Sequence, residues 1–84
     1  MLARYLDIAM EMATYEIIED DGSYWGEIPG FQEGVWAKEK TLPACQRELR
    51  EGLSDWIALR LRLRLAIPEL GQMNLNQIGD VAHA

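Results

Sequence analysis

The first pattern along this chain is a helical one. Apolar residues near the N-terminus recur every three or four positions, and polar residues occupy a separate stripe, as in an amphipathic helix that faces a core. We therefore predict a short helix over residues 2–10, which needs tertiary packing because a helix of this length is marginal alone. Its apolar stripe consists of Leu2, Tyr5, Leu6, Ala9, Met10 and Ala13.

An alternating pattern follows and predicts β-strands. Residues 12–19 and 23–29 each alternate between apolar and polar side chains, which is typical of strands with one buried face. A Pro-Gly pair should end the second strand, and a third strand is predicted over residues 34–38. The alternation in the third strand separates Trp36 from Val35 and Ala37.

The turn between the first two strands is predicted at Asp21-Gly22. This pair favours a type I′ hairpin turn, which needs positive φ at both central positions. The turn would pair Glu19 with Tyr24, Ile17 with Gly26, and Tyr15 with Ile28. One face would then carry Tyr15, Ile17, Tyr24 and Ile28, and the other Glu16, Ile18, Trp25 and Glu27. Gly26 falls on the more apolar face, where a missing side chain would let a helix pack closely.

A second, longer helix is predicted after the strands. Thr41 is a suitable N-cap, and Pro43 falls in the first turn, where proline is tolerated. We place the end of this helix near Leu65, because Pro68 limits it, and we explain Gly52 by close packing on the sheet. The apolar stripe consists of Leu42, Cys45, Leu49, Leu53, Trp56, Leu59 or Arg60, and Leu63.

Together these elements predict a single α+β domain over residues 1–84. An N-terminal helical segment (1–11) would precede a core module (12–66), in which a three-stranded antiparallel sheet packs on one long helix. The tail (67–84) contains a possible short closing strand over residues 73–78, which would make the order β-β-β-α-β.

The composition is that of a small globular domain, with 49% hydrophobic and 26% charged residues. The single cysteine, Cys45, excludes an internal disulfide and suits a reducing cytoplasm. Charges interrupt every apolar stretch well short of the ~20 residues that a membrane helix needs, and the N-terminus lacks the features of a signal peptide. We therefore expect a cytoplasmic protein that does not enter a membrane.

Acidic residues are concentrated in the first half of the chain. The formal net charge is −6, and residues 1–42 carry nine acids and three bases, whereas residues 43–84 carry five of each. An acidic sheet repels a phosphate backbone, which makes nucleic acid an unfavourable main ligand, and it would attract a basic protein. The alternative is that these acids only keep the surface soluble.

No residues have the spacing of a catalytic or metal centre. His83 is next to the C-terminus, and Cys45 falls on an apolar stripe with no histidine to activate it. Glu19, Asp20 and Asp21 are consecutive at the predicted turn, where neighbouring side chains point apart, whereas a metal-dependent nuclease needs carboxylates that converge from different elements. We therefore expect no enzyme activity, no catalytic residue, no metal and no cofactor.

A candidate interaction surface remains on the sheet face turned away from the long helix. In the predicted register Ile18 and Trp25 are direct cross-strand neighbours, and Trp36 joins them from the third strand. Glu16 and Glu27 flank them, and a large aromatic side chain ringed by acids is typical of a protein-interaction hot spot. Three coverings stay open: the N-terminal helix, another copy of the chain, or a foreign protein.

Several segments in a fixed order resemble the HicB-like antitoxin family. They are Tyr15-Glu16-Ile17-Ile18, Tyr24-Trp25-Gly26-Glu27-Ile28-Pro29-Gly30 and Gly34-Val35-Trp36-Ala37, then Thr41-Leu42 and the helix positions Cys45, Leu49 and Leu53. The resemblance covers residues 12–66 and implies a β-β-β-α-β module, dimeric or larger, related in layout to part of a ribonuclease H-like fold. It also implies that the protein binds and neutralises a small, basic, RNA-cleaving toxin of the HicA type.

The chain departs from this family pattern at both ends. Many members carry a further DNA-binding domain after the module, but the sixteen residues after Pro68 are too few for a helix-turn-helix or ribbon-helix-helix unit. Residues 1–11 lie outside the usual motif. We therefore expect a single-module member without a C-terminal DNA-binding domain.

The expected function is that of an oligomeric antitoxin, a dimer or a tetramer, which masks a basic toxin. Its expected interface consists of Glu16, Ile18, Trp25, Glu27 and Trp36. One alternative is an orphan oligomeric module without a toxin partner, in which this surface only joins subunits. Another is a nucleic-acid-binding protein or metal-dependent nuclease that uses the acidic turn or the three arginines Arg60, Arg62 and Arg64. These arginines would share one face only as a strand, and we expect them on a helix, pointing apart.

Overall fold

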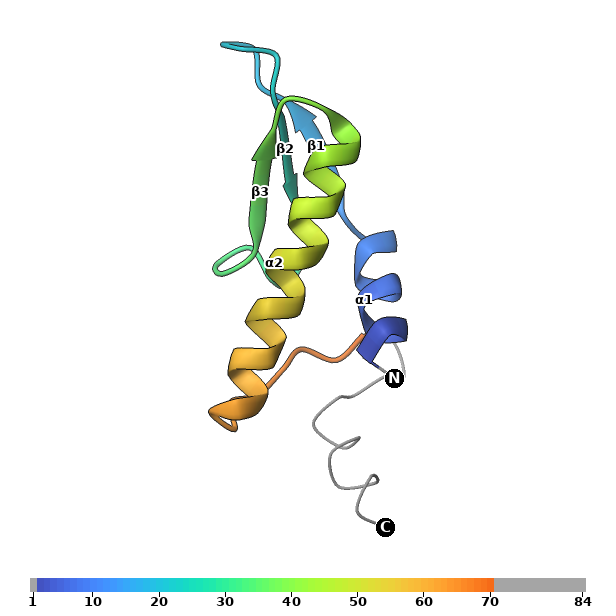
Figure 1. Cartoon of the computed structure of the whole chain (residues 1–84), viewed down its shortest axis with the longest axis vertical. Coiled ribbons are helices and arrows are strands. Elements are labelled where there is room, and N and C mark those ends of the chain that lie inside the picture. The colour runs from blue at the N-terminus through green and yellow to red at the C-terminus, as the bar shows by residue number, and fades with distance from the viewer. Residues whose placement is uncertain (1, 71–84) are drawn as a thin grey trace.

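The computed structural model describes residues 2–70, and its α+β architecture confirms the predicted fold class. Figure 1 shows that α2 crosses one face of a three-stranded sheet and that α1 lies beside α2. The elements are α1 (Leu2–Glu11), β1 (Thr14–Ile17), β2 (Tyr24–Glu27), β3 (Trp36–Glu39) and α2 (Leu42–Arg62). The predicted closing strand at 73–78 and His83 lie outside the described residues.

The sheet is antiparallel throughout, with β2 between β1 and β3. Its register differs from the predicted one by two residues, because Tyr15 pairs with Gly26 and Ile17 with Tyr24. A shift of two residues leaves each side chain on its predicted face, since side chains alternate with a period of two. The predicted faces are therefore right even though the predicted pairs are wrong.

The register differs because the hairpin loop is longer than the predicted type I′ turn. The Ile18 N–H donates to the Ser23 carbonyl at 2.7 Å, and the Gly22 N–H donates to the Ile18 carbonyl at 2.8 Å. Only Gly22 has a positive φ in this loop, at 73°. The Asp21 carboxylate accepts a hydrogen bond from the Ser23 N–H at 2.9 Å. Such a bond from an aspartate to the backbone two residues on forms an Asx-turn, which replaces the predicted type I′ turn.

The strands are shorter than predicted. Residues 12 and 13 close the end of α1 instead of beginning β1, since the Met12 N–H donates to the Ala9 carbonyl and the Ala13 N–H to that of Met10. At β3, the Gly34 and Val35 N–H groups both donate to the Phe31 carbonyl, so the strand begins at Trp36 instead of residue 34. In each case the backbone N–H groups that a longer strand would pair with its neighbour donate instead to carbonyls within a turn.

The core lies between the inner face of the sheet and α2. Cys45, Leu49, Leu53 and Ile57 recur every four residues and are fully buried. A Cβ added at Gly26 would lie 2.9 Å from Tyr15 Cε1 and 3.0 Å from Cys45 Sγ. The predicted close approach at this glycine is therefore confirmed.

For α2, the predicted N-cap is confirmed and the predicted last residue is wrong. Thr41 caps the helix as predicted, because its Oγ1 accepts from the Ala44 N–H at 3.2 Å. At the other end α2 stops at Arg62, three residues before the predicted limit at Leu65. There the Arg64 N–H donates to the Leu61 carbonyl and the Leu65 N–H to that of Arg60, while Arg64 adopts a φ of 58°. These bonds form a Schellman motif, with arginine where glycine is usual.

The packing predicted for the second half of α2 is also wrong. A Cβ at Gly52 would meet no atom within 4 Å, so close packing on the sheet does not explain this glycine. Leu59 and Leu63 are 44% and 57% exposed, although the predicted stripe placed them in the core. Figure 1 shows the reason, because α2 continues well past the end of the sheet.

The N-terminal helix packs against α2 and not over the outer face of the sheet. Tyr5 is fully buried, contacts Phe31 edge to face at 6.5 Å between ring centroids, and donates its hydroxyl to the Pro68 carbonyl. Asp7 forms an ion pair with Arg50 of α2 at 2.8 Å. Covering of the predicted interaction surface by this helix, one of the three open alternatives, is therefore wrong.

Candidate functional site

The outer face of the sheet, which neither helix covers, carries one row of side chains from each strand. Alternation and register place them there, because Tyr15, Gly26 and Ala37 align across the inner face and the intervening residues must point outward. The outer face consists of Thr14 and Glu16 from β1, Trp25 and Glu27 from β2, and Trp36 and Lys38 from β3.

Two stacked tryptophans form the centre of the outer face. The rings of Trp25 and Trp36 are 4.9 Å apart and nearly parallel, with an interplanar angle of 7°. They are diagonal neighbours, since Trp25 pairs with Lys38 and Glu27 pairs with Trp36. Trp36 is 55% exposed, so the stack presents a large apolar surface to solvent. Stacking contributes about 0.5–1.5 kcal/mol beyond burial, which holds the pair in a defined orientation.

Carboxylates lie directly beside the stack. Glu27 Oε2 accepts from the Trp25 indole N–H at 3.5 Å, a long hydrogen bond that aligns both side chains. Glu16 lies on β1 opposite Trp25 and is exposed. The aromatic surface is therefore bordered by negative charge on the β1 side.

The structure corrects the position of one predicted residue. Glu16, and not Ile18, is the direct cross-strand neighbour of Trp25. Ile18 lies two residues further toward the hairpin, where its N–H donates to the Ser23 carbonyl. The error follows from the two-residue shift in register. Of the five predicted residues, the structure brings Glu16, Trp25, Glu27 and Trp36 together.

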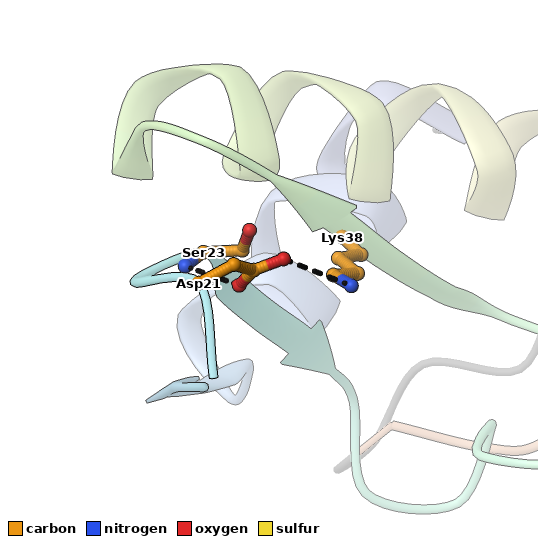
Figure 2. A network of polar contacts seen from close by, with 3 residues as sticks. All are labelled: Asp21, Ser23 and Lys38. Carbon is orange, nitrogen blue, oxygen red and sulfur yellow. Dashed lines mark hydrogen bonds and ion pairs between the residues drawn. The ribbon is translucent and has the colours of Figure 1, made fainter. Parts of the chain in front are cut away.

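Lys38 borders the other side of the stack and was missed by the sequence reasoning. Its position two residues after Trp36, on the same face of β3, was the available signal. Figure 2 shows that Lys38 reaches the hairpin loop, where its Nζ lies 3.3 Å from Asp21 Oδ2. Hydrogen bonds from Ser23, and then the Lys38 ammonium, lower the pKa of Asp21 to about 2. The loop is thus tied to the edge strand, and part of the Lys38 charge is balanced.

Within residues 2–70, no three His, Cys, Asp or Glu side chains lie close enough together to hold a metal ion. The Cys45 thiol is buried and shares its S–H between the carbonyls of Tyr24 and Ala37, each at 3.6 Å, and burial raises its pKa. No helix in this part of the chain has the length and hydropathy that crossing a bilayer requires. The groups that the outer face offers to a partner are its exposed tryptophan rings and its carboxylates.

Of the three arginines expected on the helix, Arg60 and Arg62 lie on α2 and Arg64 lies beyond it. The Arg60 guanidinium lies 4.7 Å from the Trp56 ring centroid, and its Nε–H donates to the Ala66 carbonyl at 2.7 Å. Arg62 is on the last turn of α2, and Arg64 lies beyond it with left-handed backbone. Arg60 thus ties the last turns of α2 to the segment that follows the helix.

The chain is similar to one protein family and to solved structures. A family model described as UPF0150-like matches residues 4–68, which include the whole outer face. No curated protein matches the chain. Among solved structures, the chain is similar to TTHA0281 from Thermus thermophilus, with 40% sequence identity and a TM-score of 0.77 over 87% of this chain and 89% of that one. The chain belongs to the UPF0150-like family.

Proposed function

We propose that this protein is an antitoxin of the HicB type, which neutralises a small, basic, RNA-cleaving toxin by binding it with the outer face of the sheet. The exposed Trp25–Trp36 stack beside Glu16 and Glu27 is the observation that carries this proposal. Membership of the UPF0150-like family supports it, because the segments that resemble HicB-like antitoxins lie within the matched region.

The chemistry of the outer face suits a basic protein partner. Arginine and lysine side chains bind over tryptophan faces, and a neighbouring carboxylate can then accept their hydrogen bonds. The net charge of −6 would also steer a basic partner toward this protein before contact. An aromatic centre with a charged rim is the usual arrangement of a binding hot spot.

In this proposal the protein acts by binding and has no enzyme activity of its own. The toxin is inhibited because its catalytic surface is covered. The proposal needs a cytoplasmic location, where such a toxin would meet RNA, and it needs no metal or cofactor.

The test takes a small basic protein of the HicA type as the partner, and measures its binding to this protein and its cleavage of RNA. Trp36→Ala removes an aromatic side chain that is 55% exposed and should weaken binding about 30-fold or more, as a hot-spot residue would. Glu27→Lys should do the same and should release RNA cleavage. Glu33→Lys makes the same charge change at an exposed position outside the outer face and serves as the matched control.

Unchanged affinity in folded Trp36→Ala and Glu27→Lys variants would remove the outer face from the proposal. An equal loss in Glu33→Lys would show that overall charge, and not this surface, controls binding. Turnover of RNA by this protein alone would overturn the proposal.

An orphan oligomeric module is the second candidate function. Within residues 2–70 the outer edges of β1 and β3 are open, and unpaired strand edges next to an exposed aromatic surface can join subunits. Sedimentation of the protein, alone and with the basic partner, measures the size of each assembly and so distinguishes the antitoxin from the orphan module. If the outer face only joins subunits, Trp36→Ala dissociates the oligomer and the basic partner does not bind.

A further inference from the structure

Gly52 has no structural reason within the described part of the chain. It lies in the middle of α2, where glycine costs about 1 kcal/mol relative to alanine. A Cβ at this position would meet nothing within 4 Å. By contrast, a Cβ at Gly26 would press on Tyr15 and Cys45. A small residue that no neighbour requires suggests that another surface approaches α2 there.

Gly52 belongs to an apolar stripe beside the core, and one member of that stripe, Trp56, contacts the core residue Phe31 edge to face. Gly52, Trp56, Leu59 and Leu63, which we call the second stripe, are spaced by four, three and four residues. At about 100° per residue they fall within about 60° of the helix circumference. Leu59 is 44% and Leu63 57% exposed, and Trp56 is half-buried. This spacing is that of a helix which packs against another helix.

The charges beside the second stripe change sign along α2. Glu48 and Asp55 flank it before Trp56, and Arg62 occupies the same flank at the last residue of α2. On the other flank Arg60 lies over the Trp56 ring. A parallel neighbour with the same sequence would place like charges together. An antiparallel neighbour would place acid against base.

We propose that the second stripe is the contact between two copies of this chain, whose α2 helices pack antiparallel. Leu63 of each copy would then lie over Gly52 of the other, and Trp56 would lie against Leu59. By two-fold symmetry Asp55 of each copy would pair with Arg62 of the other, so the surface is complementary to itself. A basic foreign partner fits less well, because Arg62 would repel it.

This contact leaves the outer face free. The Trp25–Trp36 stack lies on the sheet face that α2 does not cover (Figure 1), whereas the second stripe lies on α2 and its C-cap residue Leu63. A dimer formed through α2 would therefore present two outer faces, and would do so whether or not these bind a toxin. The inference thus goes beyond the proposed function and does not depend on it.

The experiment measures the dimer dissociation constant of the full chain by sedimentation equilibrium. Leu59→Glu should raise this constant about tenfold or more, because it buries a charge in an apolar contact. Leu61→Glu is the matched control, since Leu61 is also 44% exposed but lies on another side of α2, and its constant should stay within about threefold of wild type. Circular dichroism checks that both variants are folded.

Charge reversal tests the orientation of the two helices. Asp55→Arg and Arg62→Asp should each weaken the dimer about threefold or more, and the double variant should recover the wild-type constant. A monomeric wild type, a Leu59→Glu variant that dimerises normally, or an equal effect of Leu61→Glu would overturn the proposal. Failure of the double variant to recover would overturn the antiparallel pairing. Trp36→Ala should leave the dimer intact, which separates this result from failure of the proposed antitoxin role.

Discussion

Individual residues at turns and helix ends account for most of the local geometry. Asp21 accepts hydrogen bonds in the hairpin loop and approaches Lys38, and Thr41 caps α2. Arg64 holds a left-handed backbone that closes the helix. Each of these residues satisfies backbone or charged groups that the secondary structure leaves without a partner. Two of them lead to predictions that depend on a single side chain.

The Asp21 carboxylate should make stability depend on acid pH. Its pKa in the folded protein is about 2, below the ordinary value of 3.8, so the folded state prefers the charged form. The contribution to stability is therefore fully present above about pH 4 and is lost as the pH falls toward 2. Denaturant unfolding across this range should show that the difference between wild type and Asp21→Asn shrinks with acid. A difference that does not change with pH would contradict the assigned hydrogen bonds.

The protein should be less stable with arginine at position 64 than with glycine. A left-handed backbone costs a residue with a Cβ about 1 kcal/mol or more, so Arg64→Gly should raise the free energy of unfolding by about 1 kcal/mol. Arg62→Gly makes the same chemical change inside the last helical turn and should lower it by about 1 kcal/mol. Thermal or denaturant unfolding of both variants checks the opposite signs.

Secondary-structure elements pack according to where small side chains permit close approach. α2 lies on β2 and β3 because Gly26 leaves room for Cys45 beneath it. The same helix is uncovered at Gly52, where no atom approaches. The periodicity of apolar residues predicted α2 well, but it treated both halves of the helix alike. Which turns of α2 meet the sheet depends on where β3 begins, at Trp36, and the periodicity of apolar residues does not contain this information.

Gly26 and Gly52 should respond in opposite ways to alanine. Gly26→Ala forces a methyl group against Tyr15 and Cys45 and should lower the free energy of unfolding by about 1–3 kcal/mol. Gly52→Ala, placed in the Leu59→Glu background to exclude the proposed dimer, should raise it by about 0.5–1 kcal/mol through helix propensity. Unfolding measurements that show the same sign for both would contradict the packing described for α2.

The whole molecule is an acidic sheet on a helix whose end carries arginines. The outer face holds its aromatic stack beside Glu16 and Glu27, and the net charge of the chain is −6. In the proposed function this charge matters before contact, since long-range attraction accelerates association more than it slows dissociation. Salt should therefore affect the two rates unequally.

Raising the salt concentration from about 50 mM to 500 mM should slow association with the basic partner about tenfold or more, and should change the dissociation rate much less. Stopped-flow tryptophan fluorescence can follow this, because Trp25 and Trp36 lie in the proposed contact. Glu16→Lys should reduce the salt dependence, while Trp36→Ala should mainly accelerate dissociation. An association rate that does not depend on salt would show that charge steering is absent.

Local patterns in the sequence determined the order of elements, the side of each strand on which a residue lies, the N-cap at Thr41 and the close approach at Gly26. These features depend on neighbours within a few positions along the chain, so spacing and residue type are enough to predict them. They also placed Trp25 and Trp36 on one face.

Only the tertiary structure decided the register, the stacking of the two tryptophans, the place of α1 and the exposure of the end of α2. The hairpin register depends on competition between a two-residue turn and the hydrogen bonds that Asp21 makes to Ser23 and Lys38. Whether Trp25 stacks on Trp36 depends on the pairing of β2 with β3. The register is set by a balance of nearby hydrogen bonds, which residue type alone does not rank. The other outcomes are set by contacts between residues far apart in the chain, whose energies no local pattern contains.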